Sequence, residues 1–338
     1  MKKTIKKKLA IMTKPHVVIL GAGASVATIP NGDKSGNKIS AMNGFIEKLN
    51  LKDVISKVEI QTKSNNLEDI YMELDERGKR EPICKEVKED LECRIYTYMS
   101  KFRLPDEPTI YDYLVLSLSK KDLIATFNWD PLLVQAAERA SKITNDLPHF
   151  AFLHGNVGIG YCEKDCILGL NGNKCRVCGE TYIPTKLLYP VKNKDYKNNY
   201  QIKKSWEDLK NALEEAYMLT IFGYSAPKSD ESAISLLKDA WGEKENRFLE
   251  EIEIVDLKKE EEIENSWNDF IFPGHCSCYK SFFETTLAKF PKLSCEALYA
   301  SSIECRFLND KNGFTNNMSF EDVKKVINRK LDFYDLKT

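Results

Sequence analysis

The sequence has no excess of charge of either sign, no long apolar run and no internal repeat. The first two absences each exclude a class of protein. Its 50 basic and 51 acidic side chains leave a formal charge of −1, so nucleic-acid binding is not directly indicated. No stretch approaches the roughly 18 apolar residues of a membrane span. The apolar run after the basic residues 2–8 is too short for a signal peptide. We therefore expect a cytoplasmic protein that does not enter a membrane.

Histidine is scarce, with four residues, whereas cysteine is plentiful, with ten. Cysteines of a cytoplasmic protein are mostly reduced, so a cluster of them indicates a metal site or catalysis, and scattered ones indicate packing. The chain has 338 residues, of which 42% are apolar. That share is enough for a full core, and the length predicts about two domains.

Short apolar runs alternate with helical patterns along most of the chain, which is typical of a parallel sheet with helices on both faces. We expect strands at residues 16–20, 123–127, 150–153, 218–222 and 252–257. Ligands of such sheets bind beyond the carboxyl ends of the strands. Polar or glycine-rich clusters follow all five strands, so this edge is the expected site.

The predicted architecture is α/β: a Rossmann-like, doubly wound parallel sheet with a helical insertion and a small zinc-binding lobe. We assign residues 15–155 and 205–310 to the Rossmann-like domain, and 40–120 within it to a helical insertion, because apolar residues recur at helical spacing within 40–104. Residues 156–204, rich in glycine, asparagine and cysteine, form the small lobe. A charged C-terminal helix is expected within 311–338.

The first strand runs into a glycine loop, Gly21-Ala22-Gly23-Ala24-Ser25. Glycines allow a backbone to approach a pyrophosphate, and free N–H groups at the start of a following helix bind its charge. The third glycine of the usual dinucleotide fingerprint is replaced by Val26, which disfavours an ordinary hydride-transferring dehydrogenase. A tight turn without a ligand is the alternative.

The later strands end in other polar residues. Asn128 and Asp130 follow the second strand, where a helix N-cap is the alternative role. His154 follows the third strand. It can accept a proton at neutral pH, or it can be a buried, hydrogen-bonded core residue. Asp256, at the end of the fifth strand, can accept ribose hydroxyls or solvate the strand end.

Four cysteines of the small lobe form two pairs, Cys162-x3-Cys166 and Cys175-x2-Cys178. Two pairs of thiolates suit a tetrahedral structural zinc, and a full set of four thiolates leaves no position for chemistry. Four free cysteines in a loop are the alternative. Cys276 and Cys278, which follow His275, are interpreted as packing.

In order along the chain, these motifs resemble those of the sirtuin superfamily. They are Gly21 to Ser25, Thr126 to Asp130, His154-Gly155, Cys162 to Cys178 and Gly223 to Ser225, within residues 16–257. The stretches Tyr189 to Tyr196 and Phe222 to Asp230, together with Trp206, are similar to divergent bacterial sirtuin-like proteins. Many of those consume NAD in defence against phage.

The resemblance implies that NAD is the substrate and that zinc is structural. It implies that Asn128 holds the ribose and orients a water, and that His154 accepts a proton. It further implies cofactor-binding roles for Gly21, Ala22, Gly23, Ala24, Ser25, Asp33, Asp130, Gly223, Tyr224, Ser225 and Asp256.

Two departures from the protein deacylases of the family set the expected activity. Deacylases carry an Ile-Pro-Asp-Phe-Arg run where this chain has residues 29–33, and Tyr224 replaces a small residue. We therefore expect an NAD hydrolase of antiphage defence that releases nicotinamide and ADP-ribose. An NAD-dependent lysine deacylase or ADP-ribosyltransferase is the first alternative, and an NAD or ADP-ribose sensor the second. Because uncontrolled NAD loss would kill its host, we expect a homo-oligomer or a regulatory partner protein.

Overall fold

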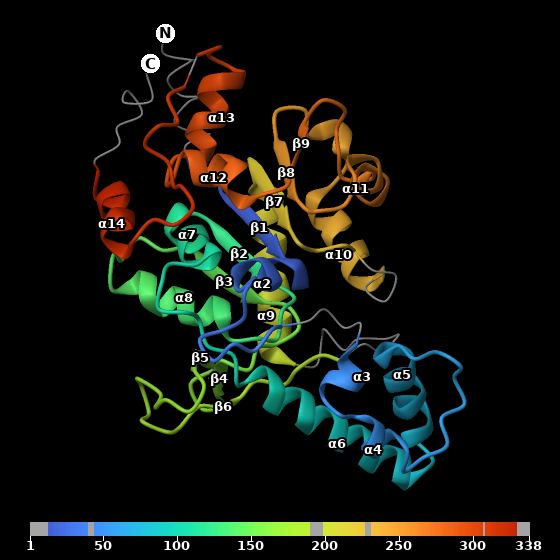
Figure 1. Ribbon diagram of the computed structural model, residues 1–338. Helices are drawn as coiled ribbons and strands as arrows, with labels where there is room; N and C mark the ends of the chain where they lie inside the picture. The colour runs from blue at the N-terminus through green and yellow to red at the C-terminus, as the bar shows by residue number, and fades with distance from the viewer. Residues whose placement is uncertain (1–12, 40–43, 190–198, 227–230, 307, 330–338) are drawn as a thin grey trace.

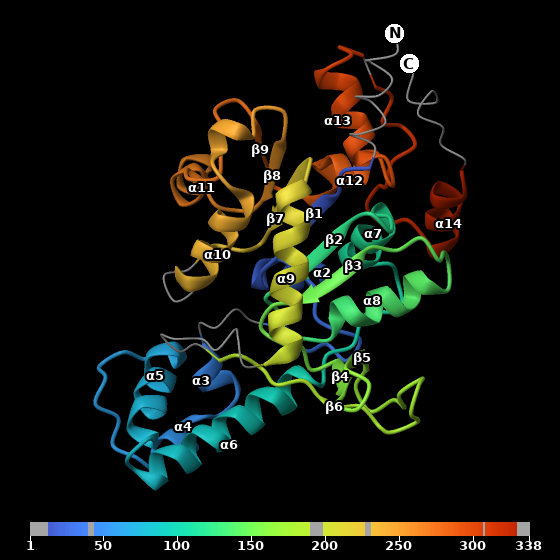
Figure 2. The ribbon, with the colours of Figure 1, turned by 180° about the vertical axis from the view of Figure 1, so that it is seen from behind.

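The computed structural model describes residues 13–39, 44–189, 199–226, 231–306 and 308–329 (Figures 1 and 2). Several expected segments extend beyond these ranges: the helical insertion at 40–43, the small lobe at 190–198, the stretch from Phe222 at 227–230 and the C-terminal helix at 330–338. Among the described residues, no helix is both long and apolar enough to cross a membrane.

Six parallel strands form the central sheet in the order β3-β2-β1-β7-β8-β9. The strands are β1 (His16–Leu20), β2 (Leu123–Thr126), β3 (His149–Phe152), β7 (Met218–Phe222), β8 (Glu251–Val255) and β9 (Cys276–Tyr279). The chain builds outward from β1 to β3 and then returns to place β7 on the other side of β1. This is the doubly wound Rossmann order, so the predicted fold class is confirmed.

All six strands end level at one edge of the sheet. Leu20 stands beside Thr126 and Phe222, and the same register continues outward to β3 and β9. The residues that follow the strands therefore emerge at the same edge. The reversal of strand order lies between β1 and β7, which is where open α/β sheets form a ligand crevice.

The sheet is covered on both faces because alternate side chains of each strand point to opposite sides. Val18 and Leu20 of β1 pack with one set of helices, and Val17 and Ile19 pack with the other. The first set comprises α2 (Ala22–Thr28), α7 (Ile110–Ser117), α8 (Leu132–Ser141), α12 (Thr286–Lys289) and α14 (Phe320–Asn328). The second comprises α9 (Tyr200–Glu215), α10 (Glu231–Trp241) and α11 (Glu260–Trp267). Helix α13 (Ser294–Ser302) packs near the start of β7.

A helical module projects from the sheet on the long helix α6 (Figures 1 and 2). It consists of α3 (Phe45–Lys48), α4 (Lys52–Ile55), α5 (Leu67–Gly78) and α6 (Pro82–Met99). Helix α6 begins at a proline, which suits the first helical turn because no N–H partner is required there. Helix α7, within the same expected insertion, lies instead on the sheet.

The small lobe is a three-stranded antiparallel sheet in the order β5-β4-β6. Its strands are β4 (Ile159–Cys162), β5 (Ile167–Leu170) and β6 (Ile183–Pro184). Gly160 and Gly169 pair across β4 and β5, and a Cβ on Gly169 would lie 2.2 Å from the Tyr182 ring. Two 3-10 turns, η2 (Lys244–Asn246) and η3 (Phe282–Glu284), complete the described elements.

Candidate functional site

The two loops at the reversal of strand order are in direct backbone contact. Gly21 N–H donates to Phe222 O and Gly23 N–H to Gly223 O, both at 3.0 Å. A Cβ on Gly23 would lie 2.8 Å from Gly223 Cα. Gly223 has a φ of +61°, which favours glycine, and a Cβ there would lie 2.3 Å from Ala24 N. Close approach of the two loops therefore accounts for all three glycines.

A buried hydrogen-bonded group lies beside this crossing. Asn128 Nδ2 donates to Gly21 O at 2.8 Å, and it also lies 2.9 Å from Ser25 Oγ and 3.1 Å from Tyr111 Oη. Ser25 Oγ donates to Asp130 Oδ2 at 2.7 Å and lies 2.9 Å from Tyr111 Oη. The structure thus brings together Ser25, Asn128 and Asp130, three of the residues expected at this edge, and adds Tyr111 of α7.

The Asn128 amide is held at its nitrogen and leaves its oxygen unused. Nδ2 makes all the side-chain hydrogen bonds described above, whereas Oδ1 accepts none from any residue that the structure describes. An amide fixed in this way presents an acceptor of set orientation to a water or a hydroxyl group.

Asp130 is fully buried, and burial raises the pKa of its carboxyl, although hydrogen bonds from Ser25 and the Leu132 backbone lower it. Its Oδ1 accepts from Leu132 N at 3.1 Å, so it also satisfies a backbone donor at the start of α8. Burial likewise raises the pKa of Tyr111. Asn156, which sequence analysis missed, donates through Nδ2 to the backbone oxygens of Asn128 and Asp130.

His154 follows β3 and is 6% exposed. Its ring meets the Phe127 ring edge-on, with 4.8 Å between the ring centroids, and the Phe127 ring stacks on that of Tyr224, with 4.2 Å between centroids. Aromatic contact thus links the ends of β3, β2 and β7. Gly155 has a φ of +77°, and a Cβ there would lie 2.3 Å from Lys186 O. The glycine after His154 is therefore required by the return of the chain from the small lobe.

The other predicted binding residues lie in local turns. Asp33 accepts hydrogen bonds from the backbones of Ser35 and Asn37 at 2.9 and 2.8 Å. Burial opposes its ionisation, but hydrogen bonds led by those from Asn37 lower the pKa of the carboxyl. Asp256 lies just beyond β8 and accepts from Lys258 N at 2.9 Å. Ser225 is exposed beyond β7.

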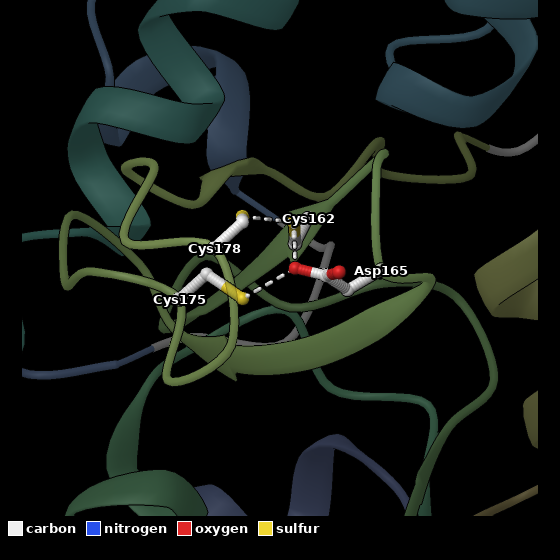
Figure 3. Close-up of side chains that lie close together, drawn as sticks. All are labelled: Cys162, Asp165, Cys175 and Cys178. Atoms are coloured by element: carbon white, nitrogen blue, oxygen red, sulfur yellow. Dashed lines mark hydrogen bonds between the residues drawn. The ribbon is translucent and has the colours of Figure 1, made fainter.

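Three thiols and a carboxylate converge in the small lobe, where their ligand atoms all lie within 4.8 Å of one another (Figure 3). They belong to Cys162, Asp165, Cys175 and Cys178. The Sγ atoms of Cys162 and Cys178 are 3.4 Å apart, and Asp165 Oδ2 lies 3.4 and 3.1 Å from the Sγ atoms of Cys162 and Cys175. Zinc–sulfur bonds of about 2.3 Å in a tetrahedron require similar separations.

Cys166, the fourth predicted ligand, lies outside this group. It is exposed, its φ is +54°, and its Sγ lies 3.7 Å from Tyr161 Oη. Asp165 faces the thiols in its place. Three thiolates and a carboxylate are a donor set that zinc accepts, so these residues fit a structural ion that would tie the loops together. Among the described residues, Cys276 and Cys278 belong to no comparable group.

No family model matches this sequence, and no curated protein matches it. Solved structures similar to the chain include Sir2 proteins. A complex of a Sir2 homolog with NAD is 13% identical, with a TM-score of 0.38 over 87% of this chain and 94% of that chain. Sir2 bound to acetylated peptide is 13% identical, with a TM-score of 0.38 over 89% and 98%. Similarity at this level leaves the activity to be argued from the residues of the site.

Proposed function

We propose that this chain is a sirtuin-like enzyme that hydrolyses NAD at the bond between nicotinamide and ribose. The observation that carries the proposal is the grouping of Ser25, Asn128 and Asp130 at the reversal of strand order, with His154 after the adjacent strand. These residues stand in motifs that resemble those of sirtuins, which is the reason for naming NAD.

The chemistry needs few groups because nicotinamide leaves with both electrons of the broken bond as a neutral base. The ribose then carries positive charge, and water adds to its C1′. Asn128 orients that water through its unused Oδ1, which is a positioning role. His154 accepts the proton that the water loses. The products are nicotinamide and ADP-ribose.

NAD would lie along the loops that follow β1 and β7. The Gly21 and Gly23 N–H groups already donate to the β7 side, and Ala24 N–H donates to Gly21 O. We therefore assign pyrophosphate binding to the remaining backbone N–H groups of Gly21 to Ser25 and not to the glycine amides. Ser225 and Asp256 stand on the side of the sheet proposed for adenosine. Asp33 and Asp130 accept hydrogen bonds from nearby backbone N–H groups, and in this way they stabilise the turns that shape the site.

The departures at residues 29–33 and at Tyr224 also support a role in antiphage defence. We propose that self-association or a regulatory partner protein restrains the activity until infection. The test is phage challenge of cells that carry the parent or the His154→Ala chain. Protection by the parent alone is expected, and equal plaque counts would contradict the role.

Incubation of the purified protein with NAD tests the activity itself, with nicotinamide release followed by chromatography. His154→Ala is expected to lower the rate by roughly 100-fold or more, the scale of a lost catalytic group. A parallel sample contains an acetylated peptide. Release that requires the peptide would identify a deacylase, and undiminished release by the variant would overturn the site assignment.

A further inference from the structure

Trp129 stands between Asn128 and Asp130 and carries a buried donor without an acceptor. The side chain is 9% exposed, and its Nε1–H makes no hydrogen bond to any residue that the structure describes. Buried indole N–H groups usually find a partner, because an unsatisfied donor loses its bond to water without compensation.

Trp129 is held both by its backbone and by its ring. Trp129 O accepts from Val157 N at 2.9 Å, and Asn156 binds the carbonyls of both neighbouring residues. The ring lies 5.1 Å from that of Tyr189, at an angle of 54°. Tyr189 in turn stacks on Tyr71 of α5 at 5.1 Å. The helical module therefore helps to hold Trp129 in a position where its donor stays unpaired.

Two other tryptophans show the usual arrangement. Trp206 Nε1–H donates to Leu153 O at 3.2 Å, and Trp241 Nε1–H donates to Phe270 O at 3.1 Å. A second orphan, the Tyr217 hydroxyl, lies just before β7 at the opposite edge of the sheet. Of these four groups, only the Trp129 donor is both unpaired and next to Asn128.

We propose that Trp129 Nε1–H is a substrate-binding donor that bonds to an oxygen on the reacting half of NAD. The inference rests on the proposed function and adds a specificity residue to it. The acceptor is either a hydroxyl of the nicotinamide-side ribose or the carbonyl of the carboxamide. ADP-ribose carries the first of these and nicotinamide carries the second, so binding of the two products tells them apart.

The test compares Trp129→Phe with Tyr217→Phe, each of which removes one orphan donor and keeps an aromatic ring. Trp129→Phe is expected to raise the KM for NAD about tenfold, the effect of one hydrogen bond, without lowering Tm. Calorimetry should show the same weakening for ADP-ribose or for nicotinamide. Tyr217→Phe should leave the KM and both affinities unchanged.

Unchanged KM and affinities in Trp129→Phe, with unchanged or higher Tm, would overturn the inference and leave the proposed function standing. A parent protein that binds neither NAD nor ADP-ribose would overturn both. Should Trp129→Phe fail to fold, the indole N–H resonances of the parent decide the matter. On addition of ADP-ribose or nicotinamide, the Trp129 signal should move, and the signals of Trp206 and Trp241 should stay. A stationary Trp129 signal would overturn the inference.

Discussion

The two edges of the central sheet each hold a buried polar group, and the two groups differ in whether they are complete. At the amino edge, His16 Nδ1 lies 2.8 Å from Ser294 Oγ, and Nε2 lies 2.8 Å from Thr220 Oγ1. His16 N donates to Asp122. At the carboxyl edge, Asn128 Oδ1 and Trp129 Nε1–H have no partner among the described residues.

The amino edge thus combines histidine, serine and aspartate, the residue types of a hydrolase, yet both ring nitrogens are occupied and the ring is fully buried. Such a network stabilises the fold and has no means of reaching a substrate. What sets the carboxyl edge apart is that the unused Asn128 Oδ1 lies beside the crossing of the glycine loops at the strand reversal, where open α/β sheets bind ligands, whereas the reactive residue types of the amino edge are fully bonded to one another.

The largest effect is expected from a substitution that disrupts the backbone crossing at the carboxyl edge. Gly223→Ala places a Cβ 2.3 Å from Ala24 N at a φ of +61°, so we expect a loss of roughly 3 kcal/mol or more in the free energy of unfolding. Urea denaturation measures it. Gly242→Ala, also at positive φ but with no atom within 4 Å of the added Cβ, is the matched control for backbone strain alone. Equal losses in the two variants would contradict loop crossing as the reason for Gly223.

The next largest effect is expected from a substitution in the hydrogen-bonded group at the amino edge. His16→Gln leaves two buried hydroxyls without their shared partner, at a cost of about 1–3 kcal/mol in unfolding free energy. The rate of nicotinamide release per folded molecule should stay within about twofold of the parent. A large loss of rate in a fully folded variant would place the reaction at the amino edge and contradict its assignment to the carboxyl edge.

The same variant tests a pH dependence. Burial lowers the pKa of His16 from 6.5 to about 3, against the attraction of Asp122. The unfolded chain therefore binds a proton there between about pH 6.5 and 3 that the folded chain does not, and the stability present above pH 6.5 is lost as pH falls through this range. His16→Gln should flatten that slope. Glu253, whose pKa burial raises, contributes the opposite slope in both proteins.

The smallest effect is expected from a substitution in the small lobe, away from both edges of the central sheet. Asp165→Asn is expected to reduce zinc retention severalfold more than Cys166→Ser, because Asp165 faces the three thiols and Cys166 does not. Elemental analysis after dialysis against a chelator measures this. The reverse ranking would restore the four-cysteine site predicted from spacing.

Local signals explain what the sequence could predict. The apolar runs at 16–20 and 218–222 gave strands with the observed bounds, and Asn128 and Asp130 were found because they follow a strand. Strand β9 was missed since its residues are short of large apolar side chains. Tyr111 joins the site only through the packing of α7 on the sheet, and such long-range contact leaves no mark in the local pattern.

The spacing of the cysteines also could not identify the fourth ligand of the candidate zinc site. Cys162 and Cys166 lie at a separation compatible with paired ligands, but the backbone at Cys166 turns its thiol away and brings Asp165 inward. Residue counts give the reach of a side chain but not its direction. The same limit applies to the glycines, whose role in the loop crossing depends on two segments about 200 residues apart.

Nicotinamide release by Asn128→Ala and His16→Gln, compared with the parent at equal folded fraction, decides which edge of the sheet carries out the reaction. We expect a loss of roughly 100-fold or more for Asn128→Ala, the scale of a lost positioned polar group, and a nearly parental rate for His16→Gln. A parental rate for Asn128→Ala would contradict the claim that the open carboxyl edge performs the chemistry.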